Sequence, residues 1–465
     1  MKKKREMDML NGPLLPQIFL FSLPLALTGI LQLLFNAADV IVVGKFAGSA
    51  SLAAVGATGA LIGLLTGAFI GISVGVNILV ARYIGCRDDA GVQRAVHSAI
   101  TLSAILGILT FLVGWFFSDP ILEWMDTPDE ILPLASRYLQ IYFLGIPATL
   151  VYNFAAAILR AYGDTKRPLL FLAISGVLNV LLNLFFVIVC KLDVAGVAIA
   201  TVISQYVSVV LILVCLARMS GPGRLQPKLL RLYPSEALRM IQIGLPAGLQ
   251  SVIFSLSNVI IQSCVNSFGS DVIAANTAAN NIGSFVYTAM NAVFHAAITF
   301  TSQNLGARRY DRIWPIFRAC LLTVTLFGVS LGLVCTVFAP QLLSIYVSKS
   351  DPAYDSVIAL GLVRTYYVTT PYFLCGVMEV CCGMVRGLGK SWLPMVVTIF
   401  GACVMRVVWI YTIFVWEHTL PTLYFSYPLS WILTAGMHIF CFAFFWKKLR
   451  QKLEAAAPAA CASTQ

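Results

Sequence analysis

Long apolar segments separated by short polar loops follow one another along the whole chain. Each is long enough to cross roughly 30 Å of hydrocarbon as a helix, which takes about 20 residues. Twelve such segments are predicted, at approximately 15–43, 52–81, 92–117, 132–158, 168–190, 194–217, 237–267, 272–303, 313–339, 356–385, 392–416 and 422–446. They leave no room for a large soluble domain. The pattern therefore predicts an all-α integral membrane protein with twelve transmembrane helices.

The second half of the chain repeats the first. The stretch ILRAYGDTKRP at 158–168 returns as MVRGLGKSWLP at 384–394, with Arg160, Gly163 and Pro168 matching Arg386, Gly389 and Pro394. Prolines inside the spans also correspond: Pro24 with Pro246, and Pro147 with Pro371. Such a repeat is typical of membrane transporters whose binding site lies between the two copies. Each of these prolines also predicts a helix kink, either static or a moving hinge.

A polar, Gly- and Pro-rich interval at 218–234 separates six spans from six. It divides the chain into an N-terminal lobe, 1–225, and a C-terminal lobe, 226–465, which ends in a short tail predicted to be disordered beyond Trp446. Because six is even, both lobes enter the membrane from the same side. We therefore expect them to be related by a pseudo-two-fold axis along the membrane normal.

Composition agrees with a membrane protein, since 59% of the residues are hydrophobic, 11% are charged and the mean hydropathy is +0.87. The net charge of +11 comes from Lys and Arg concentrated in alternate loops, with acidic residues in the others. By the positive-inside rule, both termini and the basic loops are predicted to be cytoplasmic. The positive charge therefore indicates topology, and no nucleic-acid partner is expected.

Enzyme signatures are missing from the sequence. It contains no GxxxxGK[ST] phosphate loop and no HExxH. The 12 cysteines form no CxxC pair matched by another pair, and the four histidines are scattered. We expect neither an enzyme nor a cofactor, and any energy for transport should come from an ion gradient.

Carboxylates inside spans are rare, and Asp39 and Glu379 are the clear cases. Burying Asp39 in its charged form is costly unless it exchanges a proton or binds a cation. Alternatively, Asp39 is a helix-end carboxylate at the outer water interface, since Lys45 follows six residues later. Asn179 and Asn183 lie one turn apart in the fifth span, and Thr201 lies in the sixth. Neutral oxygens beside a carboxylate suit sodium, although hydrogen bonds between helices are an alternative use.

Other polar residues within spans are candidates for the wall of a substrate cavity: Asn36, Asn153, Asn280, Asn291, His295 and Arg406. Glu379 is the repeat counterpart of Asn153, so the halves differ chemically. We predict that Arg406 pairs with Glu379, either permanently as structure or as a switch that opens on protonation or substrate binding. The second span carries a glycine stripe that predicts close helix packing: Gly56, Gly59, Gly63, Gly67, Gly71 and Gly75.

Together, SLPLAL, NAADVIVVG, LRAYGDTKRP, SQNLGA and VRGLGKSWLP resemble the multidrug and toxic compound extrusion (MATE) transporters over nearly the whole chain. The resemblance implies the MATE fold of the MOP superfamily. It also implies an efflux antiporter in the bacterial inner membrane, which exports organic, cationic and amphipathic compounds in exchange for H⁺ or Na⁺ as two lobes rock. We expect a monomer whose partners are small-molecule drugs and the lipid bilayer.

In the DNA-damage-inducible-like prokaryotic branch, an aspartate of the first helix forms a cation site with an asparagine, an aspartate and a threonine of the fifth and sixth. These fall on Asp39, Asn179, Asn183 and Thr201. Asn183 departs from the pattern, because an amide replaces the second carboxylate. This favours proton coupling or weaker sodium binding. Glu379 resembles the tenth-helix glutamate of other branches.

Two other transporter classes are considered. A lipid-linked precursor flippase of the same superfamily shares the two lobes, but such proteins often have fourteen spans and a more cationic cavity. A major-facilitator transporter also has six plus six spans, but its GxxxDRxGRR signature is not matched by GCRDDAGVQR. Drug export is the preferred interpretation.

Overall fold

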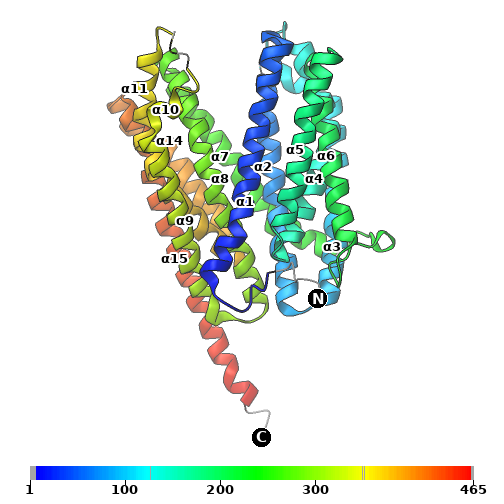
Figure 1. The fold of residues 1–465 in the computed structure, drawn as a ribbon. Helices are drawn as coiled ribbons and strands as arrows, with labels where there is room; N and C mark the ends of the chain where they lie inside the picture. Colours follow the sequence, from blue (N-terminus) through cyan, green and yellow to red (C-terminus); the bar gives the residue numbers. More distant parts are fainter. Residues whose placement is uncertain (1–6, 126, 348, 350, 462–465) are drawn as a thin grey trace. The chain divides into compact units, whose positions relative to one another are not determined.

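The computed structural model describes residues 7–125, 127–347, 349 and 351–461. In this part of the chain all regular structure is helical (Figure 1). Eleven of its helices are long and apolar enough to cross a membrane. The remaining predicted span, the eighth along the chain, is α8 (Ser270–Gly306). It has 37 residues, but its asparagines and other polar residues lower its hydropathy. The twelve predicted spans are thus all present as long helices.

The first six spans are α1 (Leu14–Val42) extended by a π-helical turn to Ala47, α2 (Ser49–Cys86), α3 (Asp89–Trp124), α4 (Leu132–Ala161), α5 (Lys166–Leu184) extended by a π-helical turn to Val189, and α6 (Asp193–Ala217). The next three are α7 (Pro234–Asn266), α8 and α9 (Ile313–Val337), and a short α10 (Ala339–Leu343) follows. The last three are α11 (Tyr354–Arg364) with α12 (Phe373–Gly387), α13 (Trp392–Thr398) with α14 (Met405–Trp409), and α15 (Leu420–Cys461).

The sequence predicted helix kinks at four prolines and a disordered C-terminal tail. Pro24, Pro147 and Pro246 lie within continuous α-helices, whereas the tenth span is interrupted at Pro371, which has φ −85° and ψ 15°. The missing N–H of proline removes one helical hydrogen bond at each of these positions. At the C-terminus, α15 continues beyond Trp446 to Cys461, where we had predicted disorder, and 462–465 lie outside the described residues.

The chain forms two compact units, and both α1 and α7 divide between them. The first unit is built mainly from Leu23–Val252. The second contains Met9–Ser22 and the chain from Ile253 onward. The changeover in α1 therefore comes one residue before Pro24. Compared with the halves 1–225 and 226–465, the beginning of α1 belongs to the second unit and the beginning of α7 belongs to the first.

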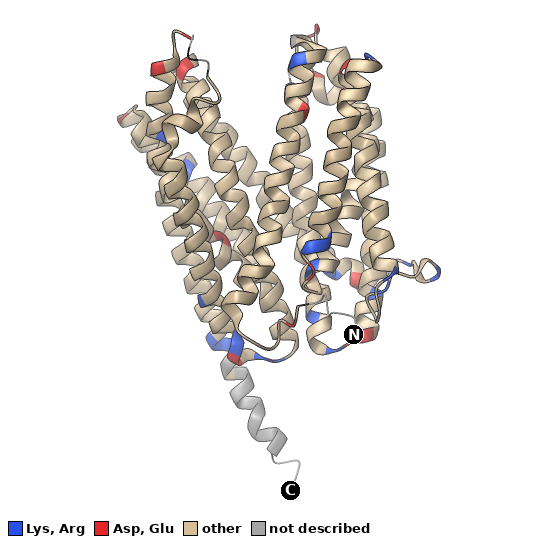
Figure 2. Ribbon diagram, viewed as in Figure 1, with Lys and Arg blue, Asp and Glu red and all other residues tan. Residues whose placement is uncertain are grey.

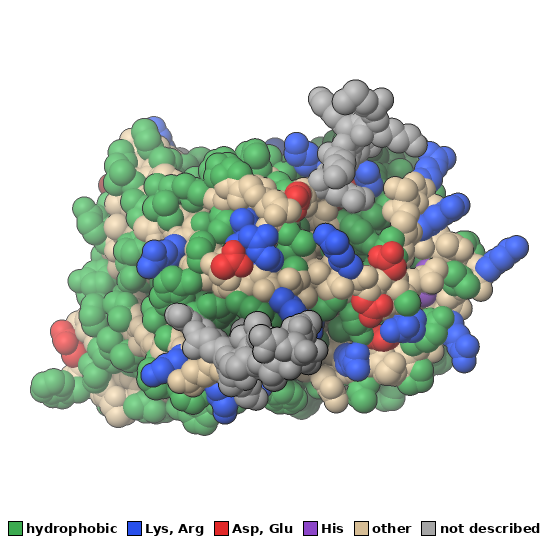
Figure 3. Space-filling model, turned by 90° about the horizontal axis from the view of Figure 1, so that it is seen from below, with side chains coloured by type: hydrophobic (Ala, Val, Ile, Leu, Met, Phe, Trp, Pro, Cys, Tyr) green, Lys and Arg blue, Asp and Glu red, His purple; other side chains and the backbone are tan. Residues whose placement is uncertain are grey.

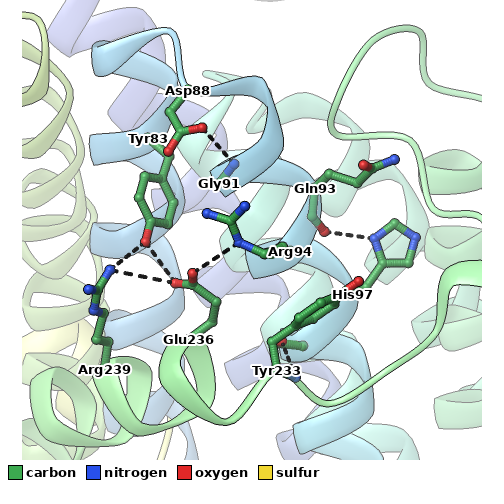
Figure 4. Close-up of polar contacts among 10 residues, drawn as sticks. Tyr83, Asp88, Gly91, Gln93, Arg94, His97, Tyr233, Glu236 and Arg239 are labelled. Atoms are coloured by element: carbon green, nitrogen blue, oxygen red, sulfur yellow. Dashed lines mark hydrogen bonds and ion pairs between the residues drawn. The ribbon is translucent and has the colours of Figure 1, made fainter.

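Polar contacts explain why the start of α7 belongs to the first unit (Figure 4). Glu236, in the first turn of α7, is only 2% exposed. Its carboxylate accepts a hydrogen bond from the Tyr83 hydroxyl at 2.7 Å and pairs with Arg94 Nε at 3.4 Å. Arg239 donates to the same Tyr83 hydroxyl at 2.8 Å. These charge-assisted contacts fasten α7 to α2 and α3.

The linker before α7 is also held on the first unit. The backbone N–H of Gln226 donates to His97 Nε2 at 3.1 Å, and that of Tyr233 donates to Ser98 Oγ at 3.0 Å. The other ring nitrogen of His97 lies 2.7 Å from the Gln93 carbonyl oxygen (Figure 4). The polar interval at 218–234, which divides the sequence, is therefore attached to α3 by two hydrogen bonds. We call this interval the strap.

Only part of the glycine stripe on α2 makes close contact. A Cβ added to Gly71 would lie 2.4 Å from the Gly248 nitrogen, and one added to Gly75 would lie 2.2 Å from the Met240 carbonyl oxygen. The backbones of α2 and α7 thus touch here, as small residues allow. Towards the other end of α2, a Cβ on Gly56, Gly59 or Gly63 would meet no heavy atom within 4 Å in the described structure.

Basic residues gather at one end of each unit's helices (Figure 2). In the first unit, Arg82, Arg87 and Arg94 lie in the sequence around the α2–α3 connection. In the second, 308–312 between α8 and α9 contain three arginines. Figure 3 looks onto these ends and shows Lys and Arg side chains among fewer acidic ones. The cytoplasmic orientation of these ends stays a prediction from the positive-inside rule.

Candidate cation site and arginine pocket

The four side chains predicted to form the cation site lie together within the first unit. Asp39, near the end of α1, accepts a hydrogen bond from Asn183 of α5. The same Asn183 amide nitrogen lies 3.4 Å from Asn179 Oδ1, and Asn179 Nδ2 donates to Thr201 Oγ1 of α6 at 3.3 Å. Helices α1, α5 and α6 thus contribute to one continuous polar chain. Its role in binding a cation stays a prediction.

The donor chemistry of this group fits a hard monovalent cation. Asn183 is fully buried, yet its Oδ1 has no hydrogen-bond partner. A buried carbonyl oxygen that accepts no hydrogen bond can coordinate Na⁺ or accept a hydrogen bond from a protonated group. Asp39, Asn179 and Thr201 supply further oxygens, with Asp39 as the single carboxylate. In the described structure no three or more His, Cys, Asp or Glu side chains form a group that could hold a metal ion.

Two tyrosines beside Asp39 escaped the sequence reasoning. Tyr138 and Tyr142, one turn apart on α4, stack with ring centroids 6.2 Å apart, and both lie near enough to Asp39 for electrostatic interaction. The sequence signal that could have found them is the pair of tyrosines four residues apart within one span, which places both rings on the same helix face. Sequence alone did not place these two rings near Asp39.

The predicted ion pair between Glu379 and Arg406 is absent from the described structure, which corrects that prediction. Glu379, half-buried on α12, instead interacts electrostatically with Arg386 and Tyr287. Arg406 is fully buried and donates from Nε to Ser430 Oγ at 2.9 Å. Aromatic rings supply part of its stabilisation in place of a carboxylate.

Those rings are Tyr427 and Phe254, whose centroids lie 4.4 and 5.2 Å from the Arg406 guanidinium carbon. All three residues line a cavity of about 150 Å³ within the second unit. Arg364 of α11 also lines it and donates from Nη2 to Asn280 Oδ1 at 3.0 Å. We call this cavity the arginine pocket.

The remaining cavity candidates are dispersed. Asn280 and Arg406 line the arginine pocket, whereas Asn291 and His295 lie further along α8 and outside its lining. In the first unit, Asn153 donates to the Thr149 carbonyl of its own helix at 2.8 Å, and Asn36 is exposed one turn before Asp39. The structure thus brings together the predicted cation ligands but not the predicted substrate-cavity residues.

Comparison with known proteins identifies the family. The profile of the MatE family matches residues 24–185 and, separately, 246–412. The chain belongs to this MATE family. The two matched segments are the two copies of the internal repeat, so the MATE assignment rests on both halves. MATE proteins are transporters, and this one is a multi-pass membrane protein.

Similar proteins agree over most of the chain. The probable multidrug resistance protein YoeA of Bacillus subtilis is 27% identical over 92% of this chain and 93% of its own length. An FAD transporter of Shewanella oneidensis is 25% identical over 74% of this chain and 76% of its own. A solved outward-facing multidrug resistance MATE transporter of the MOP superfamily superimposes with a TM-score of 0.89 at 22% identity, covering 97% of this chain and all of that one. The predicted fold is therefore confirmed.

Proposed function

We propose that this MATE protein is a secondary active antiporter of the bacterial inner membrane. It exports organic, cationic and amphipathic compounds in exchange for H⁺ or Na⁺, and it alternates access by rocking its two lobes. Relatives named as multidrug resistance proteins support the export of organic compounds. Both termini are proposed to be cytoplasmic and the protein to act as a monomer.

The observation that carries the proposal is the polar chain from Asp39 to Thr201. A carboxylate inside a membrane span, bonded to a buried amide whose oxygen is unpartnered, is suited to take up and release a cation. Glu379 makes no hydrogen bond or ion pair in the described part of the chain, so we assign the dominant coupling role to Asp39. Competition between cation and cationic substrate for negative charge then couples the two fluxes.

Uptake of a fluorescent cationic dye into proteoliposomes tests this proposal. We expect an imposed Na⁺ or pH gradient to drive uptake, whereas liposomes with no gradient show only passive entry. The gradient that drives uptake identifies the coupling ion. Failure of both gradients with a broad dye panel would contradict drug export. A scrambling assay with fluorescent polyisoprenyl lipids would then test the flippase.

Restoring a second carboxylate should change ion preference. Asn183→Asp places a second negative charge beside Asp39, and hard cations bind more tightly as the ligand charge rises. We expect the half-saturating Na⁺ concentration for dye transport to fall about tenfold, by analogy with the effect of ligand charge count. Asn266→Asp, the same change at an exposed position at the end of α7, should leave that concentration unchanged. An unchanged Na⁺ response in Asn183→Asp would remove Asn183 from the site.

A further inference from the structure

We propose that the arginine pocket of the second unit binds the carboxylate or phosphate of an organic anion whose remaining part is aromatic. The inference deepens the proposed transport function by adding an anionic group to the substrates that the protein can hold. It rests on unpaired hydrogen-bond donors, on a lining that contains no acidic residue among those described, and on the aromatic walls. It does not use the cation site of the first unit.

Buried donors without acceptors converge on the pocket. Arg406 is fully buried, and both of its terminal nitrogens, Nη1 and Nη2, have no hydrogen-bond partner. Arg364 is 6% exposed and its Nε is likewise unpartnered. The indole nitrogen of Trp431, a residue 1% exposed, also lacks an acceptor. All three residues line the same cavity. Buried polar groups are nearly always paired, so these donors indicate a missing acceptor.

The charge of the pocket selects an anion. Two guanidinium groups line it, and no Asp or Glu belongs to its lining in the described structure. Neither arginine forms an ion pair with a described carboxylate. The neutral oxygens of Ser430 and Asn280 each accept one bond but carry no negative charge. Planar guanidinium groups bind carboxylate and phosphate in a bidentate manner, which matches the two free nitrogens of Arg406.

The walls of the pocket explain why the ligand should also be aromatic. Five aromatic residues line it: Phe254, Tyr287, Tyr372, Tyr427 and Trp431. Tyr427 and Phe254 hold the Arg406 guanidinium by cation–π contact, which fixes its position but leaves Nη1 and Nη2 without acceptors. The volume of about 150 Å³ accommodates a small ring system with one acidic group.

A matched pair of ligands provides the test. Full-length protein in phosphatidylcholine nanodiscs is titrated calorimetrically with 2-naphthoate and with 2-naphthamide, which has a similar shape without the charge. We expect naphthoate to bind about tenfold to 100-fold more tightly, because hydrogen bonds to a charged group are the strong ones. Equal binding of the two ligands to the native protein, or binding of neither, would overturn the proposal.

Arginine variants locate the site. In Arg406→Gln and Arg364→Gln, the preference for naphthoate should fall to about one, whereas Arg318→Gln, an exposed arginine of α9, should keep it. Melting temperature and gel filtration verify that each variant is folded. If Arg406→Gln does not fold, Arg364→Gln and the native ligand preference decide the question. Retention of the full preference in folded Arg364→Gln would overturn the assignment.

Two further arms separate related explanations. A lipid phosphate offers the same chemistry as a soluble anion, so the titration is repeated with phosphatidylglycerol in the nanodiscs. Loss of naphthoate binding there identifies a lipid phosphate as the occupant and overturns the aromatic part of the proposal, whereas unchanged binding identifies a soluble anion and supports it. Asp39→Asn should abolish gradient-driven dye transport yet keep naphthoate binding. The proposed function and the arginine pocket can therefore fail independently.

Discussion

Asp39→Asn is expected to lower gradient-driven dye transport by roughly 100-fold, the upper end of the loss seen when a supporting group of a metal site is removed. Asp39 is the only carboxylate in the polar chain with Asn183, Asn179 and Thr201. The substitution keeps the shape of the side chain and its ability to accept the bond from Asn183. It removes the charge that attracts Na⁺ or receives H⁺.

The measurement is the initial rate of dye uptake into proteoliposomes under the gradient that drives the native protein. Asp129→Asn, the same change at an exposed position of the first unit, is the matched control and should transport at the native rate. Glu379→Gln should retain a substantial part of the rate, because the coupling charge resides on Asp39. Native-like transport by folded Asp39→Asn would contradict the assignment of coupling to the first unit.

Gly75→Ala is expected to destabilise the protein by about 3 kcal/mol, the cost of overpacking a tight interface. The added methyl group would lie 2.2 Å from the Met240 carbonyl oxygen and 2.8 Å from the Gly244 nitrogen. Both are backbone atoms of α7, which cannot rotate away as a flexible side chain can. Helices α2 and α7 would have to separate, which would also strain the contacts of Glu236 with Tyr83 and Arg94.

Thermal loss of monodisperse protein in detergent measures this effect. Gly59→Ala lies on the same helix, where an added Cβ meets no described atom within 4 Å. We expect that control to melt at or slightly above the native temperature, because alanine favours helix over glycine by up to about 1 kcal/mol. If Gly75→Ala and Gly59→Ala melt alike, the close α2–α7 contact does not exist in the membrane protein.

The sequence predicted the spans well because crossing a bilayer imposes a length and a composition on each helix. Even α8, which is more polar than the other spans, was among the twelve predicted segments, at 272–303. The repeat could be detected in the sequence because both copies retain the same prolines and basic turns. The cation-site residues were named through resemblance, and their spacing on α5 already placed Asn179 and Asn183 on one helix face.

The wrong prediction concerned a contact between residues far apart in the sequence. Arg406 was paired with Glu379 because both are charged residues inside spans, yet aromatic rings and Ser430 surround the arginine. The division of the chain at the strap stays a prediction, and the structure adds that His97 and Ser98 hold the strap on the first unit.

Sequence by itself thus determined the membrane class, the twelve spans, the repeat and the family, since these follow from hydropathy and from local motifs. Only the tertiary structure decided which helices meet: that α1, α5 and α6 join Asp39 to two amides, that half of the glycine stripe touches α7, and that two arginines share one aromatic pocket. The reason is physical. Hydropathy fixes which segments enter the membrane, whereas the packing of side chains between helices depends on three-dimensional contacts that no periodicity encodes.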